Sequence, residues 1–257
     1  MRALVSIYQI TAYYTSFALF CVLSFTLNCF CLFASWLPAT PAIERFFQRL
    51  VHWHFKTFVT WLLASRIVPV RYEGFDRWPR ARGLVVVANH PGLMDIGFLL
   101  ARVPEAVCIF KPAVGRNPLY NITARRAGYI PSNGGHHLLR EASAKIAGGY
   151  TLVIFPEGTR TKGGVLNPLK PGFAAIARMA RAPIQLVRIV YDSRLLSKEG
   201  PPWWRVPRLP ARITVSLGPC LPPPDPDGAA ADTVAEIEGW FRGQSATFPE
   251  GQSPTTA

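Results

Sequence analysis

Hydrophobic residues dominate positions 3–43 of the chain, and this run contains no charged side chain. From Ala3 to Ile43 there is no Asp, Glu, Lys, Arg or His. A helix needs about 20 residues to cross a hydrocarbon core of about 30 Å. The stretch Tyr13–Trp36 supplies that length, with aromatic side chains near both of its ends. The pattern predicts that residues 1–43 form a membrane anchor, either one tilted transmembrane helix or a helical hairpin.

A cleaved secretory signal peptide is the alternative interpretation of this run. The apolar region of such a peptide has about 7–15 residues and ends at a cleavage site between small residues. The uncharged run here is longer, and Arg2 is the only basic residue before it. Basic residues follow it instead, at Arg45, Arg49 and Lys56. By the positive-inside rule we expect the rest of the chain to lie in the cytoplasm, at the cytoplasmic face of a bacterial inner membrane.

Two further segments have compositions typical of the membrane interface. Residues 44–70 mix aromatic side chains with His52, His54 and Lys56, which is too polar for a span. This mixture favours an interfacial helix over 46–66, and a helix packed on the globular domain is the alternative. The segment PPWWRVPRLP at 201–210 is expected to be a loop whose paired tryptophans contact the membrane or a partner.

From Gly83 onward, short β-branched runs alternate with segments of helical periodicity. Strands are expected at Gly83–Ala88, Val107–Phe110, Thr151–Phe155, Ile184–Tyr191 and Arg212–Leu217. Helices are expected at Asp95–Val103, Pro118–Ala127, Gly135–Ala147, Pro171–Arg181 and Thr233–Arg242. This alternation predicts an α/β domain over 71–220, with a mostly parallel sheet flanked by helices. Residues 221–257 are expected to form a Pro-rich linker, a short helix and a flexible tail.

Positive charge is concentrated in the middle of the chain. The 257 residues carry 28 Lys+Arg against 15 Asp+Glu, for a formal net charge of +13. Residues 101–212 hold eighteen of the basic and five of the acidic side chains. Such a region suits nucleic acid, an anionic bilayer or a phosphorylated substrate. No nucleic-acid-binding signature is present, and the long apolar run argues against a nucleic-acid partner.

The five cysteines do not form a pattern that holds a metal or a disulfide framework. Their number is odd, and the sequence has no CxxC pair and no Cys/His ladder. We therefore expect no metal site and no resident cofactor.

The segment Asn89-His90-Pro91-Gly92-Leu93-Met94-Asp95 carries the first candidate chemistry. It follows a predicted buried strand, so His90 lies at a strand's carboxyl end, where the active sites of α/β domains gather. Residues five apart on one helix do not face each other, but Pro91-Gly92 interrupts the helix and lets Asp95 turn back toward the imidazole. A carboxylate on one ring nitrogen leaves the other free to act as a general base. Otherwise His90 is a turn residue and Asp95 caps the next helix.

A second motif, Phe155-Pro156-Glu157-Gly158-Thr159-Arg160, also follows a predicted strand. Gly158 allows the backbone to approach a ligand closely, and free N–H groups in this turn are suited to an oxyanion. The guanidinium of Arg160 is a planar fork that matches phosphate. A turn with a surface arginine is the alternative interpretation.

Taken together, the two motifs resemble the lysophospholipid acyltransferase family, whose best-known members are the 1-acylglycerol-3-phosphate acyltransferases. The resemblance includes Leu169-Lys170-Pro171-Gly172 and the strand start Ala182-Pro183-Ile184, and it covers about residues 70–220. It implies a membrane-associated O-acyltransferase that takes its acyl chain from acyl-CoA or acyl carrier protein. It also implies a lipid acceptor, and no cofactor beyond the donor substrate.

The resemblance assigns roles to individual residues. His90 is implied to be the general base and Asp95 the residue that orients it. The residues implied to bind substrate are Asn89, Lys111, Asn133, Glu157, Gly158, Thr159 and Arg160.

One segment departs from the family pattern, which has an arginine for the acceptor phosphate between the two motifs. Here Asn133 or Gly134 stands at that place, and an amide cannot neutralise a phosphate dianion. Lys111, Arg125 or Arg126 would have to compensate. Otherwise the acceptor is a different hydroxylated lipid, such as an amino-acid lipid. A non-catalytic, membrane-anchored lipid-binding relative is the remaining alternative.

Overall fold

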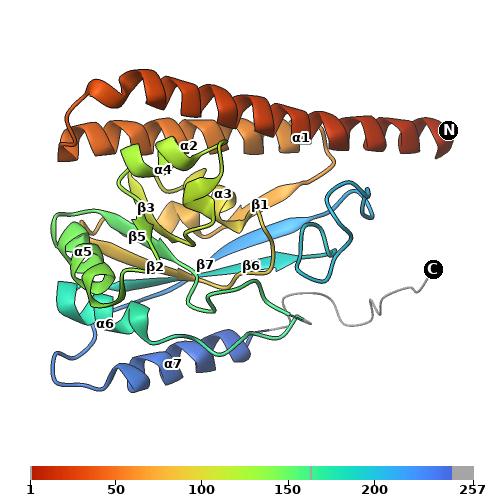
Figure 1. The fold of residues 1–257 in the computed structure, drawn as a ribbon. Helices are drawn as coiled ribbons and strands as arrows, with labels where there is room; N and C mark the ends of the chain where they lie inside the picture. Colours follow the sequence, from red (N-terminus) through yellow and green to blue (C-terminus); the bar gives the residue numbers. More distant parts are fainter. Residues whose placement is uncertain (1, 163, 245–257) are drawn as a thin grey trace.

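The N-terminal quarter of the chain forms a helical hairpin that covers one face of a sheet. The computed structural model describes residues 2–162 and 164–244. Helix α1 (Arg2–Phe33) and helix α2 (Pro41–Ala64) run side by side in opposite directions, joined through a short 3₁₀ turn (Figure 1). Thr40 caps α2 by accepting a hydrogen bond from the Ile43 N–H, and Pro41 occupies the first helical position.

Helix α1 is attached to the rest of the molecule along most of its length. Its stretch Ala3–Trp36, with mean hydropathy 2.2, is long and apolar enough to cross a membrane. In the structure, the Tyr8 hydroxyl donates to the Ser65 carbonyl at 2.8 Å near one end of the helix. Near the other end, the Asn28 amide oxygen accepts from the N–H of Thr123 at 3.0 Å. The apolar helix therefore lies against the α/β domain.

The sheet contains seven strands; five of them run in one direction, and β1 and β7 run in the opposite direction. The strands are β1 (Val70–Glu73), β2 (Leu84–Ala88), β3 (Ala106–Phe110), β4 (Ile130–Pro131), β5 (Thr151–Ile154), β6 (Ile184–Tyr191) and β7 (Ile213–Leu221). Their order across the sheet is β1-β7-β6-β2-β5-β3-β4, and β7 is antiparallel to β6 but parallel to β1. The predicted fold class, a mostly parallel sheet flanked by helices, is confirmed.

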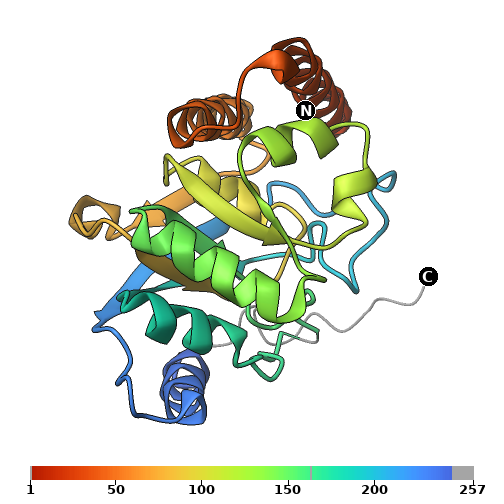
Figure 2. The same ribbon diagram turned by 60° about the vertical axis from the view of Figure 1, so that its left-hand side comes forward.

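Helices cover both faces of the sheet (Figure 2). Besides α1 and α2, they are α3 (Asp95–Leu100), α4 (Asn121–Arg126), α5 (Gly135–Ala147), α6 (Gly172–Ala180) and α7 (Ala230–Arg242). The five residues of β2 are fully buried and divide between two apolar cores. Leu84, Val86 and Ala88 join the core beneath α1–α4, and Val85 and Val87 join the core beneath α5–α7. Burial on both faces explains why β2 is a continuous apolar run.

The structure differs from the predicted elements mainly at their ends. Helix α3 ends at Leu100, before the predicted Val103, and α7 begins at Ala230, before the predicted Thr233. The helix expected from Pro118 begins only at Asn121, after a turn in which the Asn117 side chain accepts from the Leu119 N–H. Strand β7 continues past Leu217 through Pro219, because that proline lies beyond the part of β7 that pairs with β1. Strands β1 and β4 were not predicted, since each is very short.

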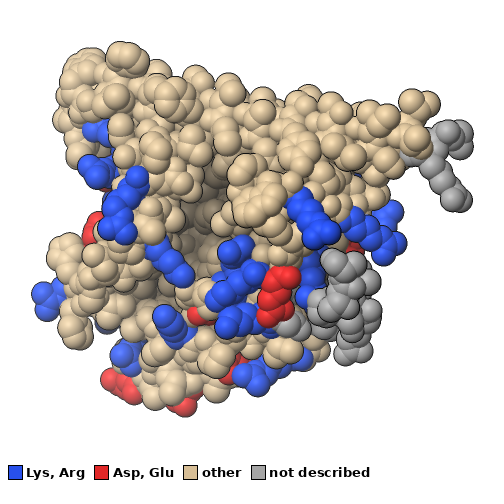
Figure 3. All heavy atoms as spheres, turned by 45° about the vertical axis from the view of Figure 1, so that its right-hand side comes forward, with Lys and Arg blue, Asp and Glu red and all other residues tan. Residues whose placement is uncertain are grey.

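The carboxyl ends of β2, β5, β3 and β4 share one edge of the sheet, toward the right of Figure 1. Figure 3 turns this side forward. The surface is hollowed beneath the N-terminal helices, and Lys and Arg side chains gather below and beside the hollow. Both sequence motifs follow strands that end at this edge.

Candidate active site

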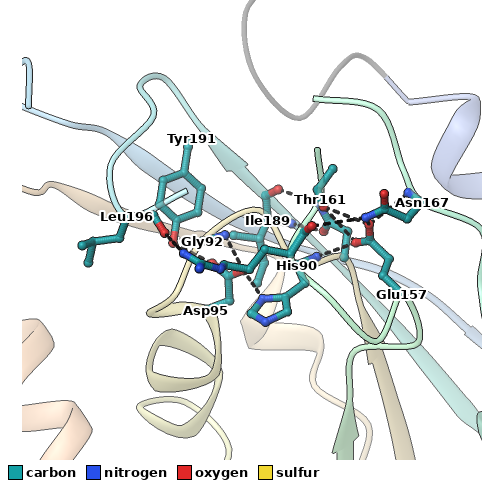
Figure 4. A network of polar contacts seen from close by, with 11 residues as sticks. His90, Gly92, Asp95, Glu157, Thr161, Asn167, Ile189, Tyr191 and Leu196 are labelled. Carbon is teal, nitrogen blue, oxygen red and sulfur yellow. Dashed lines mark hydrogen bonds and ion pairs between the residues drawn. The ribbon is translucent and has the colours of Figure 1, made fainter. Parts of the chain in front are cut away.

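The turn after β2 brings His90 and Asp95 into direct contact. His90 Nδ1 and Asp95 Oδ2 are 2.8 Å apart (Figure 4). Asp95 is the first residue of α3, and its Oδ2 also accepts from the Gly92 N–H at 2.8 Å. The carboxylate thus binds the turn before the helix and does not cap α3. The imidazole stacks on Phe155 with ring centroids 4.3 Å apart, and its side chain is 21% exposed.

Asp95 is fully buried and is held by a third donor, the hydroxyl of Tyr191. This hydroxyl donates to Asp95 Oδ1 at 2.6 Å from the last residue of β6. Burial raises the pKa of the Asp95 carboxyl, while the hydrogen bonds from His90, Tyr191 and Gly92 oppose that rise. Gly92 has to lack a side chain here, because a Cβ atom would clash with the Tyr191 hydroxyl.

The side chain of Asn89 joins two strands. Its side-chain amide exchanges two hydrogen bonds with the backbone of Ile189 in β6, at 2.7 and 2.8 Å, and the residue is 3% exposed. These bonds fix the end of β2 against β6 directly before His90. The Asn89 side chain, which was expected from the sequence to bind substrate, thus has a positioning role in the structure.

Glu157 is likewise buried, and it holds the two motifs together. Its Oε1 accepts from the backbone N–H of His90 at 2.8 Å, and its Oε2 accepts from the Asn167 side chain at 2.6 Å. The Thr161 hydroxyl and the Asn167 N–H donate to the same carboxylate. Thr161 N–H in turn donates to the His90 carbonyl at 2.7 Å. With these donors around it, the carboxylate orients the turn that carries His90.

Replacing Glu157 with alanine should therefore destabilise the fold itself. The change leaves several buried N–H and O–H groups without an acceptor, and we expect a loss of about 3 kcal/mol in the free energy of unfolding. Chemical denaturation in mild detergent measures this loss. Glu236→Ala, on the exposed side of α7, is the matched control and should change stability little. Equal stability of the two variants would contradict the structural role of Glu157.

The remaining residues of the second motif surround the turn at the end of β5. Gly158 has φ of 65°, and a Cβ there would lie 2.8 Å from Lys170 Nζ, so the ammonium group lies over this glycine. The Gly158 N–H donates to the Phe155 carbonyl, so it is not free to bind an oxyanion as the sequence suggested. Arg160 donates through Nη1 to the Leu196 carbonyl at 2.8 Å, and Lys198 Nζ lies 3.4 Å from the Thr159 hydroxyl.

Lys111 and Asn133 lie on the same edge of the sheet but farther from His90. Lys111 directly follows β3, and Asn133 comes two residues after β4; both are exposed. Strands lie about 4.8 Å apart, so β3 and β4 are roughly 10 and 14 Å from β2. Within 2–162 and 164–244, no hydrogen bond joins either residue to the network around His90. They line the periphery of the site.

The structure adds three residues that the motifs did not single out as site residues. Tyr191 supports Asp95, Asn167 supports Glu157, and Lys170 lies over Gly158. Lys170 belongs to the quoted Leu-Lys-Pro-Gly segment, and its position beside a candidate phosphate site was the available signal. Tyr191 and Asn167 carry no local signal, because only the pairing of β6 with β2 and the path of the loop after β5 bring them near.

Chemically, the arrangement provides a base with one reactive nitrogen. Asp95 occupies Nδ1, which leaves Nε2 to take a proton from a hydroxyl group. When the ring becomes positively charged, the buried carboxylate stabilises it. The cationic groups of Lys170, Arg160 and Lys198 lie at the neighbouring turn and suit an anionic ligand.

The part of the chain that carries both motifs is similar to known proteins. A family model described as acyltransferase matches residues 69–190, which hold both motifs. A 1-acyl-sn-glycerol-3-phosphate acyltransferase of Helicobacter pylori is 33% identical over 122 residues, covering 45% of this chain and 52% of the relative. The protein of the same name from Cocos nucifera is 32% identical over 131 residues, covering 48% and 41%. A lyso-ornithine lipid O-acyltransferase of Rhizobium meliloti is 26% identical over 161 residues, covering 60% and 51%.

A solved structure shares the fold over almost the whole chain. It is the 1-acyl-sn-glycerophosphate acyltransferase PlsC from Thermotoga maritima, with a TM-score of 0.67 and 24% identity. The match covers 94% of this chain and 97% of that one. By contrast, the match to the curated relatives named above spans only about half of their length, from 41% to 52%.

Proposed function

Because this chain belongs to the lysophospholipid acyltransferase family, we propose that it moves a fatty acyl chain from an acyl thioester to the hydroxyl of a lysophospholipid such as 1-acylglycerol 3-phosphate. The observation that carries the proposal is the His90–Asp95 contact at 2.8 Å at the hollowed, basic edge of the sheet. The buried dyad also favours an enzyme over a non-catalytic lipid-binding relative, because binding alone needs no oriented base.

The proposed reaction uses the imidazole of His90 twice. Nε2 takes the proton of the acceptor hydroxyl as its oxygen attacks the thioester carbonyl, while Nδ1–H stays bonded to Asp95. The tetrahedral intermediate then collapses, the C–S bond breaks, and the imidazolium returns the proton to the leaving thiolate. The products are an ester and a free thiol. Because a thioester is already activated, the step needs no covalent enzyme intermediate.

Basic side chains near the dyad are the candidates for holding the phosphate of the acceptor. Lys170, at Gly158, and Arg160 lie on the turn that Glu157 fixes against His90. Lysine and arginine bind phosphate through charge-assisted hydrogen bonds. We assign the acceptor phosphate to Lys170 and Arg160. We assign the donor, either the phosphates of acyl-CoA or an acidic acyl carrier protein, to the Lys and Arg side chains that gather around the hollow in Figure 3.

We also assign a lipid bilayer to the outer face of the helical hairpin. Many large apolar side chains of α1 and α2 are more than 40% exposed; they are Leu4, Val5, Ile7, Tyr8, Ile10, Tyr14, Val22, Phe25, Phe30, Leu32, Phe33, Phe46, Trp53 and Leu63. Exposed apolar surface of this extent marks a protein or membrane contact. Since α1 is tied to the domain along its length, the hairpin is proposed to immerse one face in the lipid, with the site at the cytoplasmic surface.

The test is an acyl-transfer assay with defined substrates. Detergent-solubilised protein is incubated with labelled acyl-CoA or labelled acyl carrier protein and a panel of lysolipids, and the products are identified by mass. We expect 1-acylglycerol 3-phosphate to be converted to the diacyl product. If no lysolipid is acylated from either donor, the proposed function is wrong.

A second acceptor belongs in the panel because of Asn133. This neutral residue stands where the family pattern has an arginine, and a lyso-ornithine lipid O-acyltransferase is among the relatives. Preferential acylation of a lyso-ornithine lipid would assign the protein to an amino-acid lipid acceptor by the same chemistry. Preference for the glycerol phosphate would indicate that other basic residues replace the missing arginine.

Tyr191 gives a prediction about positioning. Tyr191→Phe removes one donor from the Asp95 carboxylate, which raises the pKa of Asp95 further and loosens the hold on His90. We expect kcat to fall about tenfold and the acidic limb of its pH profile to move to higher pH. Tyr72→Phe is the control, because Tyr72 is partly buried and its hydroxyl donates to the Phe98 carbonyl. A pH profile in the Tyr191 variant that equals the native one would exclude this role.

A further inference from the structure

Two adjacent tryptophans are exposed in the long loop between β6 and β7. Trp203 is 55% exposed and Trp204 is 62% exposed, and their rings meet edge to face at 5.7 Å. Neither ring belongs to an apolar core of the domain or to the network around His90. Tryptophan is concentrated at membrane interfaces, where its apolar ring and polar N–H are both satisfied.

The loop is fastened to the apolar helix α1. The Tyr13 hydroxyl donates to the Trp203 carbonyl at 2.9 Å, and the Tyr14 hydroxyl donates to the Trp204 carbonyl at 2.8 Å. The ring of Phe17 lies 5.7 Å from that of Trp203. Figure 1 shows the loop beneath the N-terminal half of α1, which extends past the end of α2. The tryptophans are therefore held at the flank of the exposed apolar surface of the hairpin.

A basic pocket lies in the same loop. It has a volume of about 340 Å³ and is lined by Asp192, Ser193, Arg208, Leu209, Pro210 and Arg212. The Gln9 side chain donates to the Leu209 carbonyl, so the pocket adjoins α1 as the tryptophans do. Its lining is polar and carries two arginines against one carboxylate. A guanidinium fork pairs well with phosphate oxygens.

The charged groups in the pocket wall leave it with a net positive charge. Asp192 Oδ1 accepts from the backbone N–H of Arg212, and the Asp192 carboxylate lies 3.9 Å from the Arg212 guanidinium. Arg208 has no ion pair within the part of the chain that the structure describes. The Ser193 hydroxyl is buried in the pocket wall and has no hydrogen-bond partner there. The site thus combines a basic opening with an unpaired polar group beneath it.

We propose that this loop is a second membrane contact, in which Trp203 and Trp204 enter the headgroup layer and the Arg208–Arg212 pocket binds the phosphate of an anionic phospholipid. Both halves of the surface adjoin α1, so one bilayer plane reaches them together with the hairpin. The lipid is a structural ligand here, separate from the acceptor at His90. The inference rests on the proposed function only in that the hairpin is taken to face a bilayer.

The test identifies the lipids next to the two tryptophans and requires no enzymatic turnover. Full-length protein is reconstituted into vesicles that contain brominated phosphatidylcholine or brominated phosphatidylglycerol at equal fraction, with no acyl donor. Bromine quenches indole fluorescence at short range. A Trp203→Phe/Trp204→Phe variant keeps two exposed aromatic rings, and the difference from native protein isolates the emission of the pair. Because no reaction is measured, the result is independent of the acyl-transfer assay.

We expect brominated phosphatidylglycerol to quench the pair more strongly than brominated phosphatidylcholine. Each arginine near an anionic surface corresponds to roughly a fivefold preference for anionic lipid, so Arg208→Gln/Arg212→Gln should remove the difference. Arg140→Gln/Arg181→Gln removes the same amount of charge from the α5–α6 layer, and this control variant should keep the difference in quenching between the two lipids. Absence of quenching, or equal quenching by both lipids, would overturn the proposal. Loss of the difference on adding inorganic phosphate would assign the pocket to a soluble anion instead.

Discussion

The variant His90→Ala is expected to lose nearly all acyl transfer, with kcat lowered about 10²- to 10⁴-fold. Alanine removes the nitrogen that takes the hydroxyl proton, and nothing else in the described network offers a base with a free lone pair next to Nε2. The imidazole is partly exposed and stacks only on Phe155, so its loss should leave the fold and the membrane association intact. Transfer of labelled acyl chains to the preferred lysolipid measures the effect.

The matched control for this variant is His137→Ala. His137 is on α5, its side chain is 83% exposed, and its ion-pair contact is with the surface residue Glu141. The same chemical change at this position should leave kcat unchanged. Native turnover in His90→Ala, or an equal loss in His137→Ala, would remove His90 from the mechanism.

The variant Asp95→Asn should show nearly as large a loss of activity. The amide is isosteric with the carboxylate, but it presents an N–H group to donors and cannot stabilise the imidazolium. We expect kcat to fall by about 10²- to 10⁴-fold with little change in KM. Asp76→Asn, in an exposed turn, is the control and should be fully active. Near-native kcat in Asp95→Asn would show that the dyad geometry has no role in the reaction.

The stability of Asp95→Asn, compared with that of the native protein, should increase as the pH rises. Burial raises the pKa of Asp95 above its ordinary value of 3.8, so the folded protein binds more protons than the unfolded chain as the pH rises above 3.8. The free energy of unfolding of the native protein therefore falls as the pH rises, until the pH passes the pKa of Asp95 in the folded protein. Asparagine does not titrate, so the stability of the variant relative to native should increase as the pH rises above the ordinary carboxyl pKa of 3.8. A constant difference would contradict the raised pKa.

Much of the site was predictable because its chemistry is local in sequence. His90 and Asp95 lie on one short turn, and Pro91-Gly92 allowed the hypothesis that the two side chains meet, beside the alternative that Asp95 caps the next helix. The runs of β-branched residues before each motif indicated buried parallel strands. Parallel strands end at one edge, which is why the two motifs lie together in the structure.

The roles of the polar residues in the two motifs were not predictable in the same way. Asn89 and Glu157 were expected to contact substrate, but both are buried and bind backbone groups of Ile189 and His90. A sequence shows which side chain is polar, but not whether the fold supplies it with internal partners. In a buried turn, unpaired N–H groups are costly, and these two side chains satisfy them.

By itself the sequence determined the fold class, the bilayer-length apolar run and the base–carboxylate pair, because each depends on residues within one element or one turn. Only the tertiary structure decided what lies beside them. It placed Tyr191 on Asp95 through the pairing of β6 with β2, and it bound the Trp203–Trp204 loop to α1. These contacts join residues roughly a hundred or more positions apart, and the physical reason is that their energy is set by packing across elements, which leaves no periodicity or spacing to read.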